Sequence, residues 1–199
     1  LGHVHFGINY LNNPDSFHLG KHVIVIGAGN AAMDVARTAL RKGVRSLQCF
    51  SRTSTVAASK HEYEYAVLEG VEFIYSKIPV EITDDGVIFA DALEKEDGSV
   101  EQIPGTEKLY PADSVIISIS QGPKNKLVNT TKGLDVNSRG LLLTDEEGHT
   151  SRPEIFASGD VVNGARTVVE AVAHFKVVAE AMDAYMQSLP KEETVTEKQ

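Results

Sequence analysis

Cysteine is nearly absent from this chain of 199 residues, and Cys49 is its only one. A single thiol excludes an intramolecular disulfide framework, a CxxC redox pair and any zinc or iron–sulfur site built from several local thiolates. His3 and His5 share one face of an extended segment, but a metal site needs a third ligand and none is predictable nearby. We therefore expect no metal site and a reducing, cytoplasmic setting.

Long apolar runs are absent as well. No stretch approaches the roughly 18 residues of a membrane-spanning helix, and the N-terminus lacks the charged-then-apolar layout of a signal peptide. Basic residues are few, because 19 Lys and Arg against 28 Asp and Glu give a formal charge of −9. This charge repels nucleic acid and anionic bilayers, so we expect neither as a partner. Because the first residue is Leu1 rather than Met, we also expect a fragment of a longer protein.

What is present is an ordinary globular composition, with 42% hydrophobic and 24% charged residues. After an irregular lead-in at residues 1–20, apolar periodicity predicts three strands and two helices. The strands are expected at residues 22–26, 46–50 and 71–75, and the helices at residues 30–42 and 60–69. Such alternation is typical of an α/β fold with a parallel sheet and crossover helices.

The pattern then changes to short extended runs. Asp-Gly hairpin pairs at 85–86 and 97–98 separate runs at residues 80–83, 87–93 and 100–103, and they predict a small antiparallel meander. An apolar strand at residues 113–120 returns the chain to the main sheet. Beyond it we expect short strands at residues 141–144 and 154–157, a helix at residues 167–188 and a charged, disordered end.

A glycine-rich turn lies between the first predicted strand and helix of this sheet. Its residues form the pattern G-x-G-x-x-A: Gly27, Ala28, Gly29, Asn30, Ala31 and Ala32. Gly27 permits the tight turn, Gly29 lets a pyrophosphate approach the backbone, and Ala32 lets the helix pack on the strand. The helix N-terminus then supplies free N–H groups for phosphate. The pattern predicts a dinucleotide site; the alternative is a glycine turn needed only for folding.

The residues after the second strand bear on coenzyme specificity. An NAD site usually carries Asp or Glu about 20 residues past the glycines, where it binds the ribose 2′-hydroxyl. This chain has Ser51, Arg52 and Thr53 at that place. A guanidinium with neighbouring hydroxyls suits a 2′-phosphate, so we expect NADP rather than NAD, with Lys60 as a second phosphate ligand. The alternative is that Arg52 is a solvated loop residue.

A second signature stands near the C-terminal end. An apolar run at residues 154–157 leads into Gly159 and Asp160, and the next helix is expected to begin near Thr167 and Val168. By spacing alone, Asp160 can be an N-cap or turn residue.

These segments resemble the NADPH-dependent flavoprotein reductases typified by the small subunit of glutamate synthase and the corresponding part of dihydropyrimidine dehydrogenase, in the pyridine nucleotide-disulfide oxidoreductase superfamily. The resemblance runs from about residue 20 to residue 186 and depends on residues 25–43, 58–73 and 155–173. It implies a Rossmann-like fold in which NADPH binds the glycine turn and passes hydride to FAD. It also implies flavin contacts at four residues: Gly159, Asp160, Thr167 and Val168.

Some positions differ from the family pattern. Two arginines are common where this chain has Ser51 and Arg52, and glycine is common where it has Ser120, on the nicotinamide side, and Phe175, near the flavin. The separate N-terminal glycine turn that holds the flavin pyrophosphate in the family is absent. The resemblance therefore implies four parts: a lead-in segment at residues 1–20, an NAD(P)-binding domain at 21–122, the C-terminal part of an FAD-binding domain at 123–190, and a disordered tail at 191–199.

The implied activity needs partners outside this chain. Electrons would leave the flavin through iron–sulfur clusters in the missing N-terminal segment or in a partner subunit, and no catalytic side chain is expected because the cofactors carry the chemistry. Without the missing half of the FAD domain, we expect the fragment to be inactive alone. This chain lacks the dithiol that an enzyme of the thioredoxin-reductase type requires. None of its tyrosines has a lysine four positions later, as a short-chain dehydrogenase needs. We therefore expect neither type of enzyme. The open alternative is a non-catalytic NADP-sensing or interaction module.

We expect Arg52→Ala to abolish most of the preference for NADPH over NADH, since a charge-assisted hydrogen bond to the 2′-phosphate would be lost. The loss should be about tenfold or more in relative affinity. Parallel calorimetric titrations of both coenzymes measure it, and an unchanged ratio would assign Arg52 to the solvated surface.

Overall fold

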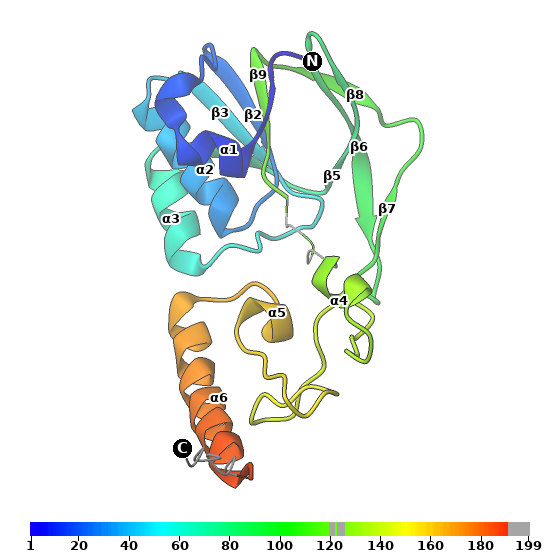
Figure 1. Ribbon diagram of the computed structural model, residues 1–199. Coiled ribbons are helices and arrows are strands. Elements are labelled where there is room, and N and C mark those ends of the chain that lie inside the picture. Colours follow the sequence, from blue (N-terminus) through cyan, green and yellow to red (C-terminus); the bar gives the residue numbers. More distant parts are fainter. Residues whose placement is uncertain (120–121, 123–125, 191–199) are drawn as a thin grey trace. The chain divides into compact units, whose positions relative to one another are not determined.

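The computed structural model describes residues 1–119, 122 and 126–190. The chain divides into two compact units, Leu1–Ser120 and Gln121–Gln199, and each is described by itself (Figure 1). The expected disordered tail at residues 191–199 lies outside the described residues.

The first unit is built on a five-stranded parallel sheet with the order β1-β9-β2-β3-β4. Its strands are β1 (Val4–Phe6), β2 (His22–Ile26), β3 (Ser46–Phe50), β4 (Glu72–Ile74) and β9 (Ser114–Ile117). In β2 and β9 nearly every residue is buried, as expected for parallel strands that are covered on both faces. The predicted α/β class with a parallel sheet is confirmed.

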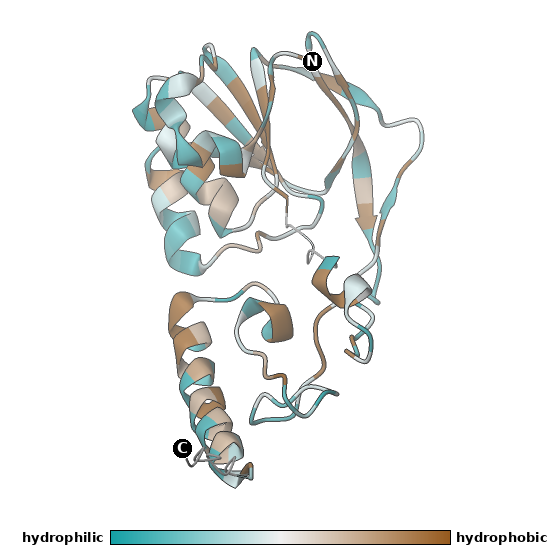
Figure 2. Cartoon of the chain, viewed as in Figure 1, coloured by the Kyte–Doolittle hydropathy of each residue, from teal (hydrophilic) through white to brown (hydrophobic). Residues whose placement is uncertain are grey.

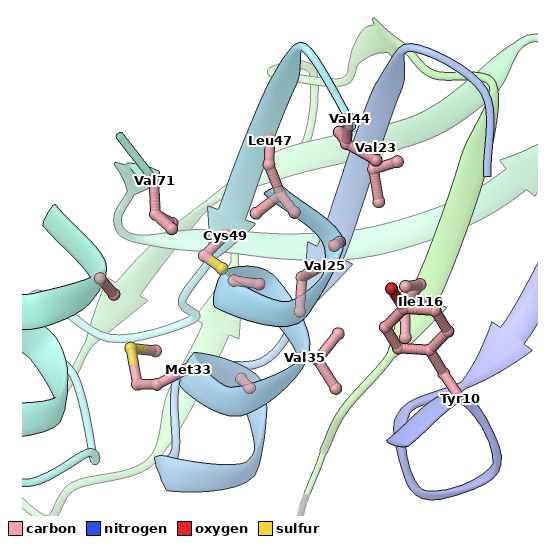
Figure 3. Packing of buried hydrophobic residues seen from close by; sticks show 14 of the residues in the cluster. Tyr10, Val23, Val25, Met33, Val35, Val44, Leu47, Cys49, Val71 and Ile116 are labelled. Atoms are coloured by element: carbon pink, nitrogen blue, oxygen red, sulfur yellow. The ribbon is translucent and has the colours of Figure 1, made fainter. Parts of the chain in front are cut away.

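Helices cover one face of this sheet (Figure 1). They are α1 (Gly7–Asn12), the short 3-10 helix η1 (Pro14–Ser16), α2 (Asn30–Arg41) and α3 (Lys60–Leu68). The apolar face of α2 is fully buried and packs on alternate residues of the central strands. Figure 3 shows Val25 and Cys49 pointing from β2 and β3 toward Met33 and Val35 of this helix. This contact fixes where α2 begins, directly after the glycine turn.

An antiparallel sheet contributes to the core on the other face of the parallel sheet. Its strands are β5 (Lys77–Thr83), β6 (Gly86–Glu94), β7 (Val100–Gln102) and β8 (Lys108–Pro111), with β6 paired to each of the others. The ring of Phe50 on β3 stacks on Phe89 of β6 with centroids 3.8 Å apart, and Tyr110 meets both rings edge-on. The predicted meander is therefore confirmed, with β8 as a strand that the sequence did not reveal.

The expectation of an irregular lead-in at residues 1–20 is wrong. β1 pairs in parallel with β9 in the register Val4 to Val115, and Tyr10 and Leu19 are buried. A three-residue strand is too short to show an alternating pattern, and the turn-prone residues after it conceal α1.

The second unit contains α4 (Lys126–Thr130), α5 (Asp160–Asn163) and α6 (Val168–Ser188). The helix expected at residues 167–188 is confirmed. The strands expected at residues 141–144 and 154–157 are wrong, because these segments form only isolated bridges, Val136 to Leu142 and His149 to Phe156. A strand needs a neighbouring strand, and the described residues of this unit supply none.

Hydrophobic residues recur along α6 (Figure 2). Several of them are exposed and follow one another in steps of three, four or seven residues: Val168, Val172, Phe175, Met182 and Met186. These steps place them on one face of the helix. None of the helices in the described part of the chain is long and apolar enough to cross a membrane.

We expect Phe89→Ala to lower the free energy of unfolding by about 3–5 kcal/mol, because it leaves a cavity in the hydrophobic cluster between the parallel and the antiparallel sheet. Urea denaturation followed by circular dichroism measures the change. Leu93→Ala on the same strand, where the side chain is exposed, is the matched control and should change it by less than about 0.5 kcal/mol. Equal effects of the two variants would contradict this role of Phe89.

Candidate functional site

The glycine turn joins β2 to α2 at the carboxyl edge of the parallel sheet. Gly27 has a φ of +129°, and its amide donates to the carbonyl of Phe50 at 3.0 Å. A Cβ on Gly27 would lie 2.3 Å from the carbonyl oxygen of Ser118. Glycine is therefore required at position 27 for two reasons: its positive φ, which other residues rarely adopt, and the close approach of the segment after β9.

Gly29 has a different environment. Its φ is −91°, it is the N-cap residue of α2 without a side-chain cap, and a Cβ there would meet no atom within 4 Å. The side chain of Ala32, three residues on, is fully buried. The first amides of a helix have no partner inside the helix. The open space around the Cβ position of Gly29 leaves room for an anion to reach them. The turn thus has the shape and polarity that a diphosphate requires.

The loop after β3 lies beside this turn, because β2 and β3 are adjacent and Ile26 pairs with Phe50. Its amides at Ala57 and Ala58 donate to the carbonyl of Ala28, at 2.9 and 3.0 Å. The amide of Ser59 donates to the Asn30 side chain at 2.8 Å. Asn30 is therefore engaged in holding the loop against the start of α2.

The residues expected to contact the 2′-phosphate lie in this loop and at the start of α3, and they differ in exposure. Ser51 is only 6% exposed, and its hydroxyl donates to the carbonyl of Thr55 at 2.9 Å, so it shapes the loop from within. Arg52 is exposed and forms no ion pair with any described residue. The exposed Lys60 at the start of α3 lies 3.8 Å from Glu64. Ser120, the expected nicotinamide contact, lies outside the described residues.

A pocket of about 420 Å³ lies in the second unit, at the start of α5 and α6. Its lining residues are Ser158, Gly159, Asp160, Arg166, Thr167, Val168, Ala171, Val172 and Phe175. The four residues named from the sequence as flavin contacts are therefore brought to one pocket. Ala171, Val172 and Phe175 were not named as contacts, although helical spacing from Val168 places them on the same side of α6.

Polar groups at the pocket are held by local hydrogen bonds. Thr167 and Glu170 form a capping box at the start of α6, and the bonds from Thr167 hold the pKa of the Glu170 carboxyl below its usual range. Asp160 accepts the amide of Arg166 at 3.4 Å. The Ser158 hydroxyl lies 3.1 Å from Nδ1 of His174. The start of α6 and one carboxylate thus face a pocket whose other walls are largely apolar.

The described residues offer no metal site and no reactive thiol. No group of three His, Cys, Asp or Glu residues among them has the geometry to hold a metal ion. Burial raises the pKa of the Cys49 thiol to about 12, which keeps it protonated at neutral pH.

Comparison with known proteins gives consistent relatives. A family model described as pyridine nucleotide-disulphide oxidoreductase matches residues 2–174. The glutamate synthase [NADPH] small chain of Azospirillum brasilense is 36% identical over 219 residues, covering 94% of this chain and 45% of the relative. The corresponding small chain of Halomonas elongata is 32% identical over 182 residues, covering 84% of this chain and 39% of the relative. The chain thus spans less than half the length of these relatives.

Solved structures share the fold. The thioredoxin reductase of T. acidophilum superposes with a TM-score of 0.74 at 21% identity, covering 96% of this chain and 59% of that chain. The family model spans most of the sequence, including the glycine turn and most of the pocket residues. The chain therefore belongs to the pyridine nucleotide-disulphide oxidoreductase family.

Proposed function

We propose that this chain is the NADPH-binding portion of an FAD-dependent oxidoreductase that passes hydride from NADPH to FAD and on to an iron–sulfur or partner acceptor. The observation that carries the proposal is the open space around the Cβ position of Gly29, at the start of α2, where no side chain caps the helix. Relatives whose names include NADPH or NADP support the choice of coenzyme. They are the glutamate synthase [NADPH] small chains and the beta subunit of the NADP(+)-dependent formate dehydrogenase of Moorella thermoacetica, 36% identical over 181 residues.

In this proposal the first unit binds NADPH. The amides at the start of α2 hold the diphosphate, since the helix dipole and free N–H groups favour an anion there. Arg52 holds the 2′-phosphate, and Lys60 can add a second positive charge. Ser51 acts indirectly by keeping the loop after β3 in shape.

The residues of the second unit fit part of a flavin site. The Asp160 carboxylate can accept hydrogen bonds from the hydroxyl groups of a ribityl chain. The start of α6 can stabilise negative charge on a bound flavin. Apolar side chains such as Val172 and Phe175 line the same pocket. When bound, FAD supplies a hydride acceptor that can release electrons one at a time. The chain's residues bind and orient the cofactors. The proposed domains are residues 21–122 for the coenzyme, with β1 and α1 added to its sheet and helical layer, and residues 123–190 for part of the flavin site.

The whole reaction needs more than this chain. The remainder of the FAD-binding domain, or an iron–sulfur partner subunit, completes the enzyme in our proposal, in keeping with relatives that are more than twice as long. We place this chain in the cytoplasm, because its one cysteine is buried and unpaired.

We expect Gly29→Ala to weaken NADPH binding by about tenfold or more, because the new methyl group enters the space where the diphosphate approaches the backbone. Calorimetric titration with NADPH measures the loss. Thermal unfolding should be unchanged, since the φ of −91° suits alanine and no atom lies within 4 Å. Gly2→Ala, also without a neighbour within 4 Å, is the control. Undiminished binding by the Gly29 variant would refute the proposed site.

We expect the isolated chain to bind FAD only scarcely, because the second glycine turn that anchors the flavin pyrophosphate is absent from the sequence. Mixing the protein with excess FAD, followed by gel filtration and an absorbance spectrum, measures the retained flavin. A stable, yellow, stoichiometric complex would contradict this expectation.

A further inference from the structure

The side chain of Glu94 reaches the loop that follows β3. Glu94 is the last residue of β6, and its Oε2 accepts the amide of Ser54 at 3.2 Å and the hydroxyl of Ser54 at 3.1 Å. Ser54 is two residues beyond Arg52. A carboxylate supplied by the antiparallel sheet therefore occupies hydrogen-bond donors of the loop on which the proposed function places the 2′-phosphate.

These donors are of the kind that binds anions. A backbone N–H and a hydroxyl on one residue form a set of donors that a phosphate oxygen can use as well as a carboxylate can, and the exposed Arg52 stands two residues before them in the same loop. In the described part of the chain, neither Glu94 nor Arg52 takes part in an ion pair, whereas the neighbouring Asp91 is paired with Lys77. No basic side chain among the described residues therefore neutralises the charge of Glu94.

The two coenzymes meet this carboxylate differently. A 2′-phosphate is repelled by it and must compete with it for the donors of Ser54. A 2′-hydroxyl can instead donate a hydrogen bond to it, as the ribose does to the acidic residue of an NAD site. The loop after β3 has no acidic residue at the place where an NAD site usually has one. Glu94 of β6, 42 residues beyond Arg52, supplies a carboxylate to this loop instead.

We propose that Glu94 is a specificity-determining residue that lowers the preference of this site for NADPH over NADH. It does so by placing its carboxylate on the loop that receives the 2′ position of the adenosine ribose. The inference depends on the proposed function, because it assumes that the nicotinamide coenzyme binds across the glycine turn and the loop after β3.

The test uses Glu94→Gln in the full chain. Glutamine keeps the size of the side chain and an oxygen that can accept the Ser54 bonds, so the loop is retained while the negative charge is removed. Glu96→Gln is the matched control: it removes the same net charge from an exposed position in the turn after β6. Circular dichroism melting of all three proteins verifies that they are equally folded.

Calorimetric titrations with NADPH and with NADH give the ratio of the two affinities for each protein. We expect Glu94→Gln to raise the NADPH-to-NADH ratio by about tenfold, and more at low ionic strength, with Glu96→Gln equal to the wild type. A ratio unchanged by Glu94→Gln, or raised equally by both variants, overturns the role of Glu94 and leaves the proposed function intact. Absence of binding of either coenzyme to all three proteins overturns the proposed function, and the inference with it.

Discussion

The close approach between Gly27 and the carbonyl of Ser118 is the constraint on which the first unit depends. It brings the end of β2 and the segment after β9 so near each other that no side chain fits between them. With the turn closed in this way, α2 begins directly above the sheet edge and its buried face packs on β2 and β3. The same closure leaves Gly29 outside, with open space before it. The closed turn and the proposed diphosphate site are thus two residues apart in one segment.

Patterns within single segments were sufficient to predict much of this arrangement. The apolar run before Gly27 and the helical spacing after it placed β2 and α2, and the Asp85-Gly86 pair placed the hairpin between β5 and β6. The four expected flavin contacts also lie on one pocket, since they are close in sequence and lie at the starts of α5 and α6. Short-range periodicity and turn chemistry carry this kind of information.

Features that depend on distant partners escaped prediction. β1 has three residues, and its place in the sheet comes from pairing with β9, more than a hundred residues away. The segments at residues 141–144 and 154–157 have the composition of strands, but the described residues of their own unit supply no strand for them to pair with. Glu94 is likewise inconspicuous in the sequence, because its contact with Ser54 results from the packing of one sheet on the other. Neither composition nor spacing reports such contacts.

The proposed coenzyme site draws on two sheets that pack on each other through a shared core. The diphosphate cradle belongs to the parallel sheet, whereas Glu94 ends a strand of the antiparallel sheet and is exposed there. A substitution at the tip of β6 therefore disturbs neither the glycine turn nor the stacked rings of Phe50 and Phe89. Under the proposed role of Glu94, such a tip is a position at which reductant choice can be exchanged in a single step during divergence of related chains, while the scaffold is inherited intact.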